Sequence, residues 1–285
     1  MILITLYVLM QLVMMLIAYL LFNVNLFEIN KNASVNFIDS FSVSELKLFI
    51  FLNQIFGLFL PALFFLLIYY KTNFFKIIDL GISSRAELPV LALAILLFSY
   101  PAIQFLVYVN GQIPISDWMS DTSLEIQEYM LKVISMDSKI DLITNIGLIA
   151  LVPAISEELF FRGMLQKELL KIFRKSHVAI VTAAVIFSAF HFQFEGFLPR
   201  LGLGLLLGYA YFYTKSFFVP FLMHFTNNAI MVVAVYLNPE KIEVTLQEEF
   251  TPVNYMIVIV SFIVVVSLFK ILKNKKEIHE DQHVV

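Results

Sequence analysis

Long uncharged stretches separated by short polar connectors dominate this chain. The first, Met1 to Phe22, contains no charged residue, and it lacks the basic start and small-residue cleavage site of a signal peptide. Seven more apolar stretches follow, at residues 48–70, 89–109, 142–161, 177–193, 198–213, 217–237 and 253–272. A helix of about 20 apolar residues can cross the hydrocarbon core of a bilayer. The pattern therefore predicts an all-α, polytopic integral membrane protein with about eight transmembrane helices, the first of them retained and the fourth continuing to Phe173.

The longest polar connector, residues 110–141, carries a different pattern. Leu124, Tyr129, Leu131 and Ile134 recur at roughly helical spacing among charged residues. Such a pattern is typical of an amphipathic helix at a membrane surface, where a tryptophan such as Trp118 anchors well. We therefore expect a short surface helix in this connector.

The distribution of basic residues predicts the orientation. Of the 19 lysines and arginines, 13 fall in connectors on one side of the predicted spans and 6 on the other. Cytoplasmic connectors carry the excess of positive charge. The count places both termini in the cytoplasm.

Composition agrees with a membrane location and excludes several kinds of chemistry. Hydrophobic residues make up 60% of the 285 positions and charged residues 14%, against roughly 45–50% and about 25% in soluble domains. The net charge of −3 gives no indication of a nucleic-acid partner. The chain has no cysteine, which excludes disulfides, thiol nucleophiles and thiolate metal ligands. No internal repeat interrupts the chain, so residues 1–285 are expected to form a single membrane domain.

Ionisable residues mark the fourth, fifth and seventh stretches. They are Glu157, Glu158, Arg162, His191 and His224. Such groups are costly inside a membrane unless paired, and they usually mark a pathway or an active centre. Counting outward from a turn near residue 174 brings the first glutamate and the first histidine to one level of two antiparallel helices. We predict that all five side chains meet in one site.

Helical spacing separates the two glutamates. Glu158 and Arg162 are four residues apart, so they share a helix face and can pair. Glu157 is rotated from them by about 100°, which favours it as the reactive carboxylate. Pro153 lacks an amide hydrogen and deprives the carbonyl of Ile149 of its helical donor, so a local kink is predicted.

Three spaced motifs carry a resemblance to a known family. They are Glu157-Glu158-x-x-x-Arg162, Phe187-x-x-x-His191 and His224-x-x-x-Asn228, with Gly204 and Gly208 on a small-residue face between the second and third. Together, in this order and spacing, they resemble the CAAX-protease and bacteriocin-processing family, also called Abi, whose members are intramembrane endopeptidases. The resemblance covers roughly residues 142–232, and it implies a catalytic core within residues 142–237.

The resemblance also implies roles for these residues. Glu157 would act as general base on a water that His191 also holds, while His224 and Asn228 would donate hydrogen bonds to the oxyanion. Glu158 and Arg162 would fix the geometry. The implied partners are the lipid bilayer and a peptide or protein substrate: a prenylated C-terminal tail, a leader peptide or a membrane-anchored segment.

Three alternatives remain open. Glu157, His191 and His224 could instead hold zinc with an open position for water. The His-Glu-x-x-His helix of zincins is absent and Asn228 suits an oxyanion better than a metal, so we prefer a mechanism without a cofactor. A non-enzymatic immunity or scaffold protein is the second alternative. The third is a proton-coupled transporter, although the paired broken helices typical of transporters are not visible.

Overall fold

The computed structural model describes residues 2–22, 41–70, 87–240 and 254–282, and within these ranges every regular element is helical. In chain order the elements are α1 (Ile2–Phe22), α3 (Val43–Gln54), η1 (Ile55–Phe59), α4 (Leu60–Tyr70), α6 (Glu87–Gly111), α7 (Asp117–Ile134), α8 (Lys139–Asn145), η2 (Ile146–Leu151), α9 (Val152–Glu158), η3 (Leu159–Leu165), α10 (Gln166–Phe173), α11 (Ser176–Ala189), η4 (Phe194–Gly196), α12 (Phe197–Thr214), α13 (Phe218–Leu237) and α15 (Tyr255–Gln282). The predicted all-α fold is confirmed.

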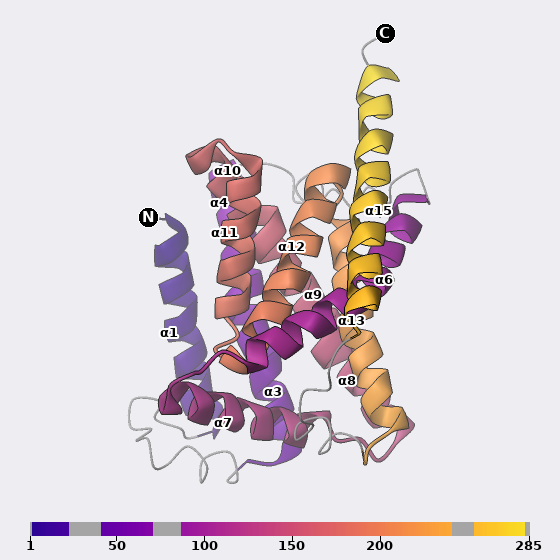
Figure 1. The fold of residues 1–285 in the computed structure, drawn as a ribbon. Coiled ribbons are helices and arrows are strands. Elements are labelled where there is room, and N and C mark those ends of the chain that lie inside the picture. Colours follow the sequence, from indigo (N-terminus) through magenta and orange to yellow (C-terminus); the bar gives the residue numbers. More distant parts are fainter. Residues whose placement is uncertain (1, 23–40, 71–86, 241–253, 283–285) are drawn as a thin grey trace.

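The apolar stretches of the sequence correspond to helices of the bundle (Figure 1). Within the described ranges, five helices are long and apolar enough to cross a membrane: Val43–Tyr69, Glu87–Gly111, Lys139–Phe173, Phe218–Leu237 and Tyr255–Asn274. Shorter apolar helices span Tyr7–Leu21 and Ser176–Ala189, and α12 accounts for the remaining stretch. The protein is therefore a polytopic membrane protein.

Two spans begin earlier than their apolar pattern suggests, because each begins at a capping box. In the second span, the Ser42 hydroxyl accepts a hydrogen bond from the Glu45 backbone N–H (3.3 Å), and the Glu45 carboxylate accepts one from the Ser42 N–H (2.8 Å). Ser138 and Asp141 form the same arrangement at the start of the fourth span. Reciprocal caps of this kind satisfy the free amides of a first turn, so polar residues that resemble a connector become helical.

The fifth span is shorter than predicted. Helix α11 ends at Ala189 rather than at residue 193, and the chain turns at Phe192, whose φ of 52° lies in the left-handed region. The prediction that His191 lies within the helix is therefore wrong. This histidine sits in the turn that follows it.

Two π-helical segments, η1 and η2, directly precede prolines within the spans. Pro61 follows η1, and Pro153 follows η2. A proline has no N–H for the carbonyl four residues earlier, and π-helical turns are a common accommodation at functional sites. The distortion expected at Pro153 thus takes the form of a wider helical turn just before the glutamates.

Helices α11 and α12 approach closely at the predicted small-residue face. A Cβ atom added to Gly204 would lie 3.1 Å from the Cβ of Ala184, and one added to Gly208 would lie 2.9 Å from Cγ2 of Ile180. A side chain at residue 208 would therefore force its neighbours to move, and one at residue 204 would be tightly packed. The close approach brings α12 against the segment that carries the glutamates.

The amphipathic surface helix predicted in the long connector is present as α7. It lies across one end of the bundle, with Val133 and Ile134 buried and the Trp118 side chain exposed. The α10–α11 turn and the C-terminal end of α15 lie at the opposite end (Figure 1).

Candidate active site

Four of the predicted site residues meet inside the bundle: Glu157 and Glu158 from α9, Arg162 from η3 and His224 from α13. Their exposed fractions lie between 0 and 6%. The Glu158 carboxylate joins the group, because its Oε2 lies 3.1 Å from Nε of Arg162 and its Oε1 lies 2.8 Å from Nδ1 of His224. The predicted Glu158–Arg162 pair is therefore present, and Glu158 binds His224 as well.

Arg162 is held by two further contacts besides the one with Glu158. Its Nη2 donates a hydrogen bond to the carbonyl of Gly204 (3.1 Å), and its guanidinium lies over the Phe187 ring at 5.0 Å. The close approach of α12 at Gly204 is what brings this carbonyl within reach. A charge fixed in this way is suited to holding Glu158 and not to moving with a substrate.

Glu157 has a different environment, although it is the next residue. Its Oε1 accepts a hydrogen bond from Nε2 of Gln54 on α3 (3.2 Å). Its Oε2 is buried, has no hydrogen-bond partner and lies 3.8 Å from Nε2 of His224. One carboxylate oxygen of Glu157 therefore makes no hydrogen bond to the described part of the chain.

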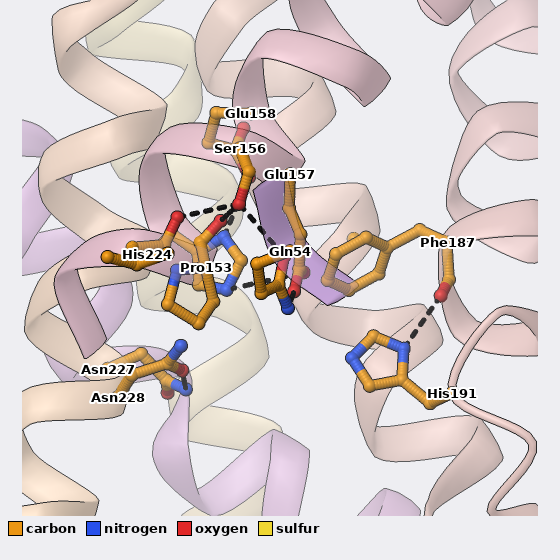
Figure 2. A network of polar contacts seen from close by, with 12 residues as sticks. Gln54, Pro153, Ser156, Glu157, Glu158, Phe187, His191, His224, Asn227 and Asn228 are labelled. Carbon is orange, nitrogen blue, oxygen red and sulfur yellow. Dashed lines mark hydrogen bonds and ion pairs between the residues drawn. The ribbon is translucent and has the colours of Figure 1, made fainter. Parts of the chain in front are cut away.

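His191 lies at the edge of this cluster, across the ring of Phe187 (Figure 2). The Phe187 ring centroid is 5.1 Å from that of His191 and 5.8 Å from that of His224. Nδ1 of His191 lies 2.9 Å from the carbonyl oxygen of Phe187, which can only accept, so Nδ1 carries a proton. In the neutral ring Nε2 is then an acceptor. His191 interacts electrostatically with Glu157, and neither carboxylate is hydrogen-bonded to it.

Asn228 lies one turn after His224, and its amide is oriented by two hydrogen bonds. Its Nδ2 donates to the carbonyl of Ile149 (3.4 Å), the group that Pro153 deprives of a helical donor. Its Oδ1 accepts from Nδ2 of Asn227 (3.2 Å), whose own Oδ1 accepts from the Tyr100 hydroxyl (3.3 Å). The oxygen of Asn228 is thus occupied, and its second N–H is available to a ligand.

Several residues near the site were missed by the sequence reasoning. Gln54 and Tyr100 come from the second and third spans, outside all three motifs. Arg200 was counted with a connector, yet it lies in the first turn of α12, bonds Gln193 at 2.7 and 2.6 Å and interacts electrostatically with Glu157. For Gln54 and Arg200 the available signal was an amide or charged side chain inside an apolar stretch, and Tyr100 offered no such signal. Tyr100, Arg200 and Asn227 also line a cavity of about 130 Å³ between α6, α12 and α13.

The zinc alternative requires Glu157, His191 and His224 to converge on one point. In the part of the chain that the structure describes, no three histidine or acidic side chains are grouped to share a metal ion. Nδ1 of His224 contacts Glu158 and Nδ1 of His191 contacts a carbonyl, which leaves both Nε2 atoms free, as in histidines that bind a metal. The proposed Glu157–His191–His224 ligand set is not assembled in this arrangement, and no step below depends on a metal.

The fold and the cluster together define a polytopic membrane protein with a buried group of glutamate, arginine and histidine side chains and an asparagine amide one helical turn away. Residues 139–230 match the family model described as type II CAAX prenyl endopeptidase Rce1-like. This match confirms the resemblance drawn from the three motifs, all of whose residues lie in the matched segment. At the level of the family, it supports an intramembrane endopeptidase.

Two curated relatives each match about a third of the chain. The uncharacterized protein YpbD of Bacillus subtilis (strain 168) is 34% identical over 92 residues, which is 31% of this chain and 44% of the relative. The membrane-embedded CAAX protease MroQ of Staphylococcus aureus (strain USA300) is 26% identical over 100 residues, 33% of this chain and 40% of the relative. The chain thus matches less than half the length of either. No solved structure matches it.

Proposed function

We propose that the protein is an intramembrane endopeptidase that hydrolyses a peptide bond through a water activated by Glu157, without a cofactor. The observation that carries the proposal is the difference between the two adjacent glutamates. Oε1 of Glu158 lies 2.8 Å from Nδ1 of His224 and its Oε2 lies 3.1 Å from Nε of Arg162, whereas Oε2 of Glu157 has no hydrogen-bond partner and lies 3.8 Å from Nε2 of His224. A general base needs such a free oxygen within reach of its proton donor.

The proposed reaction assigns a step to each polar group. Oε2 of Glu157 takes a proton from the water, with Nε2 of His191 as a second acceptor, and the resulting hydroxide adds to the peptide carbonyl. The C–N bond then breaks, and Glu157 returns the proton to the leaving nitrogen. The free N–H of Asn228 donates to the oxyanion.

His224 contributes to the oxyanion site when its ring carries both protons. Nδ1–H then donates to Glu158, and Nε2–H is available to the oxyanion. The Glu158–Arg162 pair positions His224 and does not touch the reacting atoms. We assign Glu158 the positioning role because its carboxylate lies 2.8 Å from Nδ1 of the His224 ring.

The substrate class is part of the proposal. The matched family and the relative MroQ are both described as CAAX proteases, so lipid-modified C-terminal tails are the first class to test. Leader peptides and membrane-anchored segments are the next two.

The test compares membrane-proteome cleavage fragments in cells that carry the wild type or Glu157→Gln. We expect specific fragments to vanish in the variant while the amount of inserted protein is unchanged. Glu168→Gln is the matched control, because Glu168 lies on the same long helix and contacts Lys171 at the surface. Identical fragments with the wild type and Glu157→Gln would contradict the proposal and favour a scaffold or transporter.

A second measurement separates the metal-free mechanism from the zinc alternative. We expect the purified protein to keep its activity after exhaustive chelation and to contain substoichiometric metal by mass spectrometry. Stoichiometric zinc that is lost in both His191→Ala and His224→Ala, but kept in Asn228→Ala, would establish the zinc mechanism instead.

A further inference from the structure

Gln54 is a polar side chain from outside the matched segment that contacts the proposed base. It is the last residue of α3, directly before the π-helical segment η1, and it is half-buried. Its side chain lies between Ser156 and Glu157 (Figure 2). Nε2 donates to Oε1 of Glu157 (3.2 Å), and Oε1 of Gln54 accepts from the Ser156 hydroxyl (2.9 Å).

The two contacts determine which way the amide faces. A glutamine side chain has a donating end and an accepting end, and the assignment of the two follows from the hydrogen-bond network. When the Ser156 hydroxyl donates to the oxygen of Gln54, the NH₂ group must face the carboxylate. Ser156 is 1% exposed and belongs to the same helix as Glu157, so the three groups form a closed unit.

We propose that Gln54 is a positioning residue that holds the Glu157 carboxylate with Oε2 free toward the reacting water, and that Ser156 orients the Gln54 amide. This inference rests on the proposed role of Glu157 as general base. Gln54 occupies Oε1 of the carboxylate and leaves Oε2 without a hydrogen bond, which is the arrangement that the proposed reaction uses.

The same unit accommodates the protonated carboxyl group that forms during the reaction. The single hydrogen of the Ser156 hydroxyl can go to the Gln54 oxygen (2.9 Å) or to the carbonyl of Val152 (2.6 Å). When Oε2 of Glu157 has taken the proton from water, Oε1 is still an acceptor, so the NH₂ group of Gln54 keeps its contact with Oε1. The proton on Oε2 therefore stays available to the leaving nitrogen.

The first experiment measures kcat and KM on a peptide substrate for Gln54→Leu, Ser156→Ala and the double variant. Leucine keeps most of the volume of glutamine and removes both hydrogen bonds. We expect kcat to fall about 10- to 100-fold in Gln54→Leu, as for a lost hydrogen bond to a charged group, with KM nearly unchanged. Ser156→Ala should have a smaller effect. The double variant should be no slower than Gln54→Leu, because residues that act as one unit are not additive.

Asn53→Leu is the matched control. It replaces the neighbouring amide of the same helix, whose side chain is exposed and has no hydrogen bond to the site. We expect it to retain the wild-type kcat. A wild-type kcat for Gln54→Leu, an effect on KM alone, or equal losses at Asn53 and Gln54 would overturn the inference.

The second experiment tests the contact without relying on activity. The chain has no cysteine, so Gln54→Cys and Glu157→Cys can be joined by a short bis-methanethiosulfonate reagent. A protease site inserted in the loop at residues 112–116 lets a denaturing gel show whether the two fragments stay linked. We expect a link for this pair and none for the exposed Phe51→Cys with Glu157→Cys. Absence of the link at Gln54 would overturn the inference.

The outcomes also separate this inference from the proposed function. An inactive Glu157→Gln combined with a fully active Gln54→Leu contradicts only the positioning role. A fully active Glu157→Gln contradicts the proposed function. If the crosslink between residues 54 and 157 still forms in that case, the Gln54 contact is structural only, and the positioning role is overturned too.

Discussion

At the scale of single residues, the site is governed by how two adjacent carboxylates are surrounded. Glu158 lies between Arg162 and His224 at 3.1 and 2.8 Å, whereas one oxygen of Glu157 has no hydrogen-bond partner and lies 3.8 Å from His224. Removing one partner of a buried ion pair leaves the other charge without compensation, which is costly. The two glutamates should therefore respond differently to the same substitution.

Glu158→Gln is expected to lose both activity and stability. The change leaves Arg162 buried without its carboxylate, so we expect a loss of about 3–5 kcal/mol in the free energy of unfolding. Glu157→Gln should abolish cleavage and keep near-wild-type stability. Thermal unfolding in detergent measures the difference, and equal destabilisation by the two changes would contradict the assignment.

Asn228→Ala is expected to impair turnover with little effect on substrate binding. Loss of one oxyanion donor lowers kcat by about 10²- to 10³-fold. Asn227→Ala serves as the comparison, because Asn227 orients the amide of Asn228 and is not itself assigned a contact with the oxyanion. Its effect should be smaller, and a larger loss at Asn227 would reverse the two roles.

At the scale of helices, the site depends on elements that depart from regular α-helix. η2 and η3 flank α9, which carries the glutamates, and η1 begins directly after Gln54. The carbonyl that Pro153 leaves without a helical donor is used by Asn228. The close contact of α11 with α12 then supplies the Gly204 carbonyl to Arg162.

Gly208→Ala tests this helix contact. The added methyl group would lie 2.9 Å from Cγ2 of Ile180 and 3.1 Å from Oε1 of Gln166, so overpacking of about 1–3 kcal/mol is expected. Gly147→Ala is the matched control, because its methyl group would meet nothing within 4 Å. Thermal unfolding of the two variants measures the difference in stability. Equal stability of Gly208→Ala and Gly147→Ala would contradict the close packing of α11 against α12.

At the scale of the whole molecule, the arrangement of the two ends agrees with the predicted topology. α7 lies at one end of the bundle, and the α10–α11 turn and the end of α15 lie at the other (Figure 1). We expect Lys175→Cys and Ser120→Cys to be labelled from opposite sides of the membrane, with residue 175 in the cytoplasm. The cysteine-free chain makes the labelling unambiguous. Labelling of both from the same side would contradict the eight-span topology.

The sequence by itself determined the class of the fold and the identity of the motif residues. Uncharged runs reveal membrane helices because bilayer thickness sets their length, and residues four apart share a helix face, which was enough to pair Glu158 with Arg162. Both signals are local. They failed where a local cue was ambiguous: α11 ends before His191, and capped polar residues extend the second span to Val43.

Only the tertiary structure decided which residues complete the site. Gln54 and Tyr100 reach it from helices 103 and 127 residues away from their partners Glu157 and Asn227. The contact of His224 with Glu158 likewise joins two motifs 66 residues apart. Such contacts leave no periodic trace in one sequence, because they depend on how the helices pack against one another and not on how each helix forms.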